Sequence, residues 1–319
     1  MLVVICLVLV ALLVGWLVEK IHLPAVIGQI LAGLLFGPSL LNLDLPTDWL
    51  HWAGELGVWV LMYEAGIAVD AQLLKANFKI ANRVAWLGAL VPFTVFLIIE
   101  LSLQQSLLIA SFSGLVFAAT SISITLAVLG SHHQLGSRLG SIILGAAIID
   151  DIIAIIGLSG LTLLTSGGNV NPANLLPLVC FILGFISRRF APFEAFNHGL
   201  VSIATWTVIP IFFAGIGLQI NLLTLKSNLG PLVIWTIIAI ITKMLGALVA
   251  SKWSGLPTIE AAAIGSGMIA RGEMALVILS AGLASHLITS NQFGFYTAVV
   301  TLTTVIAPFI MEPLFKRLH

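Results

Sequence analysis

The chain has 319 residues, of which 60% are hydrophobic and only 8% are charged, and its mean hydropathy is +1.16. This composition is typical of a polytopic membrane protein and argues against a soluble domain with one large core. The 13 basic and 13 acidic residues cancel, so the charge gives no reason to expect nucleic-acid binding. Cys6 and Cys180 are too few for a disulfide or metal framework.

Apolar segments of about 17 to 25 residues, separated by polar or Pro- and Gly-containing links, predict about eleven membrane-spanning helices. In chain order the expected ranges are 2–18, 23–41, 51–70, 84–103, 106–130, 137–165, 174–188, 199–221, 229–251, 258–285 and 290–314. The seventh is short and starts near Pro177, so it either crosses the membrane or re-enters it. We therefore expect an all-α polytopic membrane protein. Its single transmembrane domain would cover residues 1–319, without a soluble regulatory domain.

The basic residues fall on alternate connections between these spans. One set consists of Lys20, Lys75, Lys79, Arg83, Arg138, Arg188, Arg189, Lys252, Lys316 and Arg317. The other connections hold Lys226 alone. By the positive-inside rule the first set is cytoplasmic. We therefore predict an N-terminus outside and a C-terminus in the cytoplasm, in a plasma (inner) membrane.

Hydroxyl side chains interrupt the centre of the fifth expected span. They are Thr120, Ser121, Ser123 and Thr125. Such side chains, together with unwound backbone carbonyls, can replace the hydration shell of a small cation. Hydrogen bonding between helices is the alternative interpretation. Glu64, in the third span, is a further candidate for lining an ion path.

Two adjacent acids, Asp150 and Asp151, stand in the middle of the apolar sixth span. One aspartate at a helix centre costs about 2.5 to 3.5 kcal/mol on insertion scales, so two in succession indicate function. We expect them to bind a cation, a proton, or each in turn. Lys243, in the ninth span, lies too deep for snorkelling and needs a counter-charge, for which the aspartates are the obvious candidates.

The tenth span contains glycines that permit a break in the helix, between residues 265 and 272. Arg271 and Glu273 lie at the end of this segment, and they can neutralise each other or the exposed ends of a broken helix. We favour this charge compensation over a direct part in transport.

Six segments in this order resemble the cation:proton antiporter superfamily, in the bacterial branch of the sodium/hydrogen exchanger domain. They are residues 23–38, 64–70, 119–125, 150–151, 210–217 and 270–273. The resemblance implies an inverted-repeat antiporter fold whose fifth and tenth helices are broken and cross near the bilayer midplane. It also implies that Asp151 is the main carrier of ion and proton, that Asp150 is its neighbour, and that Lys243 pairs with the acid. Members of this two-aspartate branch are expected to exchange two protons for one Na⁺ or Li⁺.

The chain also departs from the pattern of that family. Only 59 positions separate Asp151 from Pro210, where two further helices are expected, and Gln29 stands where a glutamate is common. We expect a homodimer that is shortened by about two helices.

These observations together predict a secondary transporter rather than an enzyme. Na⁺ or Li⁺ would compete with protons for Asp151 and Asp150, which are thus the ligands of the transported metal ion, and no cofactor would be needed. The expected partners are monovalent cations, protons and the lipid bilayer. The alternatives are a K⁺/H⁺ antiporter and a non-transporting membrane component with a degenerate antiporter scaffold. An ion channel fits less well because a carboxylate–lysine pair would obstruct a continuous ion stream.

Overall fold

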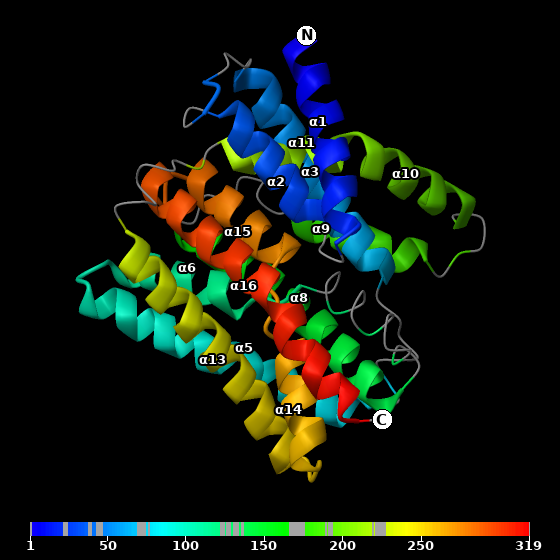
Figure 1. Cartoon of the computed structure of the whole chain (residues 1–319), viewed down its shortest axis with the longest axis vertical. Coiled ribbons are helices and arrows are strands. Elements are labelled where there is room, and N and C mark those ends of the chain that lie inside the picture. The colour runs from blue at the N-terminus through cyan, green and yellow to red at the C-terminus, as the bar shows by residue number, and fades with distance from the viewer. Residues whose placement is uncertain are drawn as a thin grey trace. The chain divides into compact units, whose positions relative to one another are not determined.

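The structure is a computed structural model of the chain. It describes residues 2–21, 25–37, 40–42, 47–68, 75, 77–121, 125, 129, 134, 137–165, 176–188, 190, 194–218, 220 and 228–318. Every regular element in these ranges is an α-helix (Figure 1), so the predicted all-α fold is confirmed.

Five of the described helices are long and apolar enough to cross a membrane. They cover Phe78–Ser102, Arg138–Leu161, Gly199–Leu218, Leu229–Trp253 and Ser290–Lys316. Shorter apolar helices cover Val4–Glu19, Ala25–Phe36, Leu107–Ala118 and Met274–Ala284. The total of about eleven spans stays a prediction. The chain divides into two compact units, which we call unit 1 (Met1–Asp70 and Ser166–Lys226) and unit 2 (Ala71–Thr165 and Ser227–His319).

Unit 1 is a bundle held together by close helix crossings. Its helices are α1 (Leu2–Glu19), α2 (Ala25–Phe36), α3 (Thr47–Ala68), α9 (Leu176–Ser187), α10 (Glu194–Trp206) and α11 (Val208–Leu218). A Cβ atom on Gly33 of α2 would lie 1.9 Å from the carbonyl oxygen of Ala214 in α11. One on Gly66 of α3 would lie 2.1 Å from that of Phe181 in α9. Glycine thus permits the close backbone contact that drives helix association in lipid.

The expected span over 199–221 corresponds to two consecutive helices, α10 and α11. A turn at Thr207 separates α10 from α11. Pro210 is the physical reason, because it has no N–H to donate to the carbonyl of Trp206 and its ring crowds that carbonyl. The two helices still form one apolar stretch, Gly199–Leu218, that is long enough to cross a membrane.

Unit 2 contains an internal repeat. Its helices are α5 (Phe78–Ser102), α6 (Leu107–Ala118), α8 (Arg138–Thr165), α13 (Leu229–Trp253), α14 (Thr258–Gly267), α15 (Glu273–Ala284) and α16 (Ser290–Lys316). Helices α5 and α13 have 25 residues each, and α13 begins 151 positions after α5. Helix α14 likewise begins 151 positions after α6. Even the left-handed residues after the long helices, Gln104 (φ 61°) and Gly255 (φ 82°), keep this spacing.

The long helices of the two repeats run antiparallel. Arg83, near the start of α5, donates to the Ser254 hydroxyl just after the end of α13, at 3.4 Å. A Cβ on Gly246 of α13 would lie 2.4 Å from the carbonyl oxygen of Leu87 in α5, so the backbones touch. This arrangement agrees with the inverted repeat that the resemblance implies.

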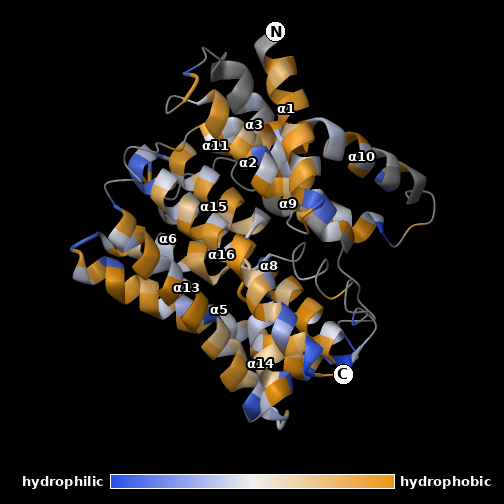
Figure 2. Ribbon diagram, in the orientation of Figure 1, coloured by the Kyte–Doolittle hydropathy of each residue, from blue (hydrophilic) through white to orange (hydrophobic). Residues whose placement is uncertain are grey.

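One end of unit 2 carries most of its basic side chains, and we call it the basic end. Asn77 beside α5 donates to Ser141 of α8 at 3.1 Å, which brings the starts of these helices together. A buried apolar cluster joins them to the ends of α13 and α16 and includes Ala81, Leu139, Ala250, Leu256 and Phe315. The exposed bases here include Lys79, Arg138, Lys252, Lys316 and Arg317. Figure 2 shows hydrophilic residues at this end, around α14 and the C-terminus.

Candidate functional site

Two interrupted helices meet in the interior of unit 2. Helix α6 ends at Ala118, and Ala119 is extended (φ −63°, ψ 147°). Helix α14 ends at Gly267, and regular helix resumes only at Glu273 of α15. The interruptions are in direct contact, because Ser121 N donates to the carbonyl oxygen of Ala270 at 2.8 Å. Such unwound backbone is tolerated at membrane depth only where protein or a cavity surrounds it.

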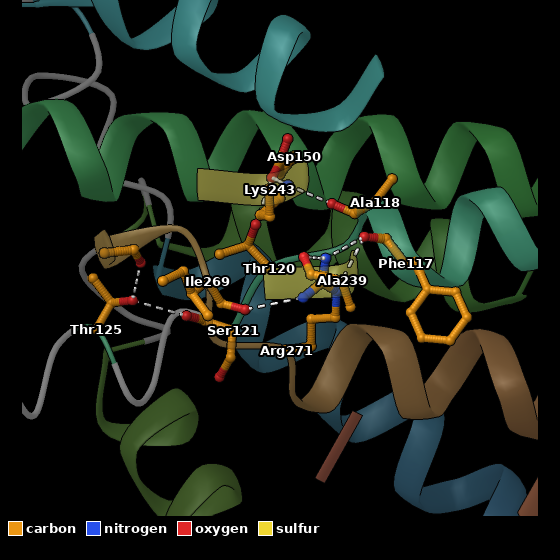
Figure 3. A network of polar contacts seen from close by, with 11 residues as sticks. Phe117, Ala118, Thr120, Ser121, Thr125, Asp150, Ala239, Lys243, Ile269 and Arg271 are labelled. Atoms are coloured by element: carbon orange, nitrogen blue, oxygen red, sulfur yellow. Dashed lines mark hydrogen bonds and ion pairs between the residues drawn. The ribbon is translucent and has the colours of Figure 1, made fainter. Parts of the chain in front are cut away.

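A side-chain bond reinforces this crossing (Figure 3). The hydroxyl of Thr125 donates to the carbonyl oxygen of Gly267, the last residue of α14, at 2.8 Å. It also donates to the carbonyl oxygen of Ser121 at 3.1 Å. The hydroxyl of Thr125 therefore bonds to backbone carbonyls near the two breaks.

A buried ion pair lies beside the crossing. Lys243 of α13 and Asp150 of α8 approach to 2.5 Å between Nζ and Oδ2, and neither side chain is exposed to solvent. Lys243 also donates to the carbonyl oxygen of Ala118, at the end of α6. Thr120 donates to the same Oδ2 of Asp150 at 2.6 Å. Figure 3 shows these side chains converging from three segments.

The second carboxylate oxygen of Asp150, Oδ1, has different surroundings from Oδ2. Oδ1 is buried and accepts no hydrogen bond from the part of the chain that the structure describes. An ionised carboxylate has room for several partners, so this oxygen is an available ligand or proton acceptor. The arrangement thus holds Asp150 firmly through one oxygen and leaves the other open.

Asp151, the next residue on α8, is also buried, with 6% of its surface exposed. Successive helical residues point about 100° apart, so the two carboxylates leave the helix in different directions. Asp151 follows Asp150 directly on α8. Two acids and Lys243 are therefore buried in the same region of unit 2.

Arg271 stands between the two breaks and is fully buried. Its Nε and Nη2 donate to the carbonyl oxygen of Phe117 at 3.0 and 2.9 Å. Nη2 also donates to Ala239 O at 2.8 Å, and Nη1 donates to Ile269 O at 3.2 Å. The last carbonyls of a helix lack partners and carry partial negative charge. Arg271 therefore compensates the buried end of α6, and Thr304 donates to the carbonyl of Arg271 itself.

The structure brings most of the predicted site residues together, all within unit 2. Hydrogen bonds and an ion pair in this region involve Thr120, Ser121, Thr125, Asp150, Lys243 and Arg271. Ser123 and the side chain of Glu273 lie outside the described part of the chain. Glu64 belongs to α3 of unit 1, so its place in an ion path stays a prediction.

Sequence reasoning missed several partners in the site. The carbonyls of Phe117, Ala118 and Ala239 accept hydrogen bonds from buried cations, and carbonyls have no signature in a sequence. Thr304 left a weak signal, since it is one of several threonines in an apolar helix. Glu100 and Tyr296, which form a separate buried contact, were also missed.

Comparison with known proteins adds independent information. A family model described as "Sodium/hydrogen exchanger, transmembrane" matches residues 8–187 and 176–317. A Na(+)/H(+) antiporter from Enterococcus hirae is 31% identical, over 99% of this chain and 98% of the relative. That alignment runs over 377 positions against the 319 residues of this chain, so at least 58 positions face gaps in this chain.

Two further relatives extend the comparison. The Na(+)/H(+)-K(+) antiporter GerN from Bacillus cereus is 28% identical over 93% of this chain and 91% of the relative. The solved structure of the sodium proton antiporter MjNhaP1 from Methanocaldococcus jannaschii superimposes with a TM-score of 0.72 at 16% identity. It covers 99% of this chain and 97% of that structure, which shows a shared fold.

Proposed function

This chain belongs to the sodium/hydrogen exchanger family, a family of multi-pass membrane transporters, and on that premise we propose that it exchanges Na⁺ or Li⁺ for protons across a membrane. The observation that carries the proposal is the buried Lys243–Asp150 pair at the crossing of two interrupted helices. Isolated charges are too costly to bury, and a pair beside unwound backbone is suited to charge exchange.

Competition for the carboxylates explains exchange. A proton or a cation can neutralise Asp150 or Asp151, but one carboxylate cannot hold both at once. If unit 2 changes its accessibility only when these carboxylates are occupied, competition couples the two fluxes and prevents leak. The adjacent acids interact, so they titrate as a coupled set rather than as separate sites.

The ligands for a transported cation would come from the two acids and the break in α6. Oδ1 of Asp150 supplies an open oxygen, Asp151 supplies a second carboxylate, and Thr120 supplies a hydroxyl already directed at Asp150. Hard monovalent cations bind such oxygen ligands. We assign the main carrier role to Asp151, in keeping with the family resemblance, and a supporting role to Asp150, whose Oδ2 pairs with Lys243.

Lys243 provides a route to electrogenic exchange. A cation that binds at the acids competes with the Lys243 ammonium for their negative charge. The buried ammonium is then no longer stabilised by that charge, so Lys243 releases its proton. Release of that proton together with one from Asp151 would give two protons for each cation. We infer that net charge crosses the membrane in each cycle.

The distribution of basic residues supports an orientation. The basic end of unit 2 gathers the exposed side chains of Lys79, Arg138, Lys252 and Lys316. By the positive-inside rule we assign this end to the cytoplasm of a plasma membrane, with the N-terminus outside. We further propose that both units form one transmembrane domain and that the protein is a homodimer.

Potassium is the second candidate cation. GerN, similar along most of this chain, is named a Na(+)/H(+)-K(+) antiporter. Cavity size and the number of oxygen ligands decide between these ions, and flexible unwound backbone can adapt to either. A non-transporting role has less support because the buried ion pair and the crossing are both intact.

Ion-driven proton movement in proteoliposomes tests the proposal. The purified protein is compared in Na⁺, Li⁺ and K⁺ gradients, with and without a clamped membrane potential. We expect Na⁺ or Li⁺ to drive a proton flux that responds to voltage. A response to K⁺ alone would favour the second candidate, and no flux in any gradient with folded protein would contradict exchange. The variant Glu312→Gln is a matched control, because this acid is exposed and pairs with Lys316 at the helix end.

A further inference from the structure

A second buried carboxyl lies in unit 2, away from the Lys243–Asp150 pair. Glu100 is in the last turn of α5 and only 3% of its surface is exposed. A Cβ atom on Gly88 of α5 would lie 4.0 Å from Lys243 Nζ. The Lys243–Asp150 pair therefore lies beside Gly88 along α5. Glu100 comes 12 positions later in α5, or about 18 Å further along the helix axis. The two buried acids therefore occupy separate sites.

The contacts of Glu100 differ in kind from those of Asp150. The hydroxyl group of Tyr296 in α16 donates a hydrogen bond to Oε1 of Glu100. Ser113 of α6, a fully buried hydroxyl, lies next to both groups. No Lys, Arg or His in the described ranges forms an ion pair with Glu100, whereas Asp150 has Lys243.

Few other titratable groups can face this site. Helix α6 has none, α13 has none before Lys243, and α8 has none after Asp151. Helix α15, which packs on α6 and α16, has Glu273 at its start and is followed by His286, which is exposed to solvent. Helix α16 contributes Tyr296, and its next titratable residue is Glu312 near the other end. In the described part of these helices, Tyr296 is thus the titratable partner of Glu100.

Aromatic rings surround this contact. The ring of Trp235 stacks on that of Tyr296 with centroids 5.7 Å apart, and the ring of Phe117 meets Tyr296 edge-on at 5.6 Å. Phe96, one turn before Glu100, stacks on Phe117 at 4.1 Å. In such surroundings a carboxylate without a cation partner is costly, whereas the protonated acid is readily accommodated.

The site also has a defined place in unit 2. It lies where α5 ends and where α13 and α16 begin, which is the end opposite the basic end. Glu100 lies in the last turn of α5, the part of that helix nearest this end.

We propose that Glu100 is a second proton-binding site of this protein, which takes up and releases one proton at the end of unit 2 opposite the basic end. On release, the carboxyl O–H bond breaks and the proton passes to water. Tyr296 keeps its own proton and continues to donate to the carboxylate. Proton binding at Glu100 does not depend on the exchange proposed above.

A contact path connects this site with the exchange site. The Phe117 ring touches Tyr296, and the Phe117 carbonyl accepts two hydrogen bonds from Arg271. The carbonyl of Ala118, the next residue, accepts a hydrogen bond from Lys243, which pairs with Asp150. The charge state of Glu100 therefore modulates the pH profile of exchange, and this second claim rests on the proposed function.

Infrared difference spectra of the protein in lipid, recorded as the pH is stepped, test proton binding directly. The wild-type protein should lose a carboxylic-acid carbonyl band as the pH rises. Glu100→Gln should lack that band, and Asp151→Asn should retain it. Tyr296→Phe should shift the band, because the hydrogen bond to the carboxyl oxygen is gone. An unchanged band in either Glu100→Gln or Tyr296→Phe would overturn the assignment of the band to Glu100. If Glu100→Gln does not fold, the result for Tyr296→Phe decides.

The pH profile of exchange tests the coupling. In proteoliposomes we expect Glu100→Gln to transport but to show a profile with one protonation step fewer than the wild type. An identical profile would remove the coupling while the infrared result still decides proton binding. Absence of transport in the wild type would contradict exchange and leave the infrared test of Glu100 intact.

Discussion

Replacement of Lys243 by methionine is expected to destabilise the protein by about 3 to 5 kcal/mol, the usual cost of removing one partner from a buried ion pair. The structure accounts for this size. Lys243 makes two hydrogen bonds, to Oδ2 of Asp150 at 2.5 Å and to the carbonyl of Ala118. Bonds that involve a charged group contribute about 1.5 to 3 kcal/mol each. Methionine has a similar length and fills the space without either bond.

The loss of stability in Lys243→Met should depend on pH in a predictable direction. In Lys243→Met, Asp150 is left as a buried carboxylate without its cation at high pH, but it becomes neutral when it binds a proton. The loss of stability relative to wild type should therefore grow as the pH rises and shrink as it falls. Adding Asp150→Asn to the same chain removes the unpaired charge and should restore part of the stability, with a coupling of about 1 to 3 kcal/mol.

Unfolding of the detergent-solubilised protein, followed by tryptophan fluorescence at acidic, neutral and alkaline pH, measures these effects. Lys252→Met is the matched control in the same helix, because Lys252 is exposed and donates a hydrogen bond to the Thr258 hydroxyl at 3.0 Å. The reasoning is refuted if both methionine variants unfold alike. It is also refuted if the loss does not change with pH, or if the effects at Lys243 and Asp150 simply add.

Three further changes test other parts of the structure. Arg271→Lys keeps the charge, but a lysine cannot reach three carbonyls at once, so unfolding measurements should show a loss of about 1.5 to 3 kcal/mol. Wild-type stability of this variant would contradict the role of Arg271 at the end of α6. Thr120→Val removes a 2.6 Å bond to a site carboxylate and should raise the Na⁺ concentration for half-maximal exchange, whereas an unchanged value would exclude Thr120 from the ion path. Gly246→Ala places a Cβ 2.4 Å from the carbonyl of Leu87 and should lower the free energy of unfolding by about 1 to 3 kcal/mol. Gly230→Ala in the same helix has open space and should be neutral or slightly stabilising. Equal effects of the two substitutions would be inconsistent with the close crossing.

Much of the candidate site follows from one physical rule applied to the sequence. Charges at membrane depth need partners, and this rule singled out Asp150, Asp151, Lys243 and Arg271 from an apolar chain. It could not say which acid Lys243 meets. The two aspartates are neighbours on one helix and lie 93 and 92 positions before Lys243, so only the packed structure shows the bond to Asp150.

The misses have equally specific causes. Carbonyl partners such as that of Phe117 have no signature, because every residue has a backbone carbonyl. Glu100 escaped notice because acids near the end of a span are usually solvated, and its hydrogen-bond partner Tyr296 lies 196 positions away in the sequence. The break before α11 was missed because Pro210 lies in an apolar stretch, where hydropathy alone predicts one helix.

The central claim is that the paired acids carry the exchanged ions, and Asp151→Asn tests it most directly. Wild-type protein, Asp151→Asn and the control Glu312→Gln are reconstituted at equal density, and proton flux driven by a Na⁺ gradient is measured in each. We predict that flux disappears in Asp151→Asn, because an amide neither releases a proton nor supplies charge to a cation, and persists in the control. Exchange at the wild-type rate in folded Asp151→Asn would contradict the account.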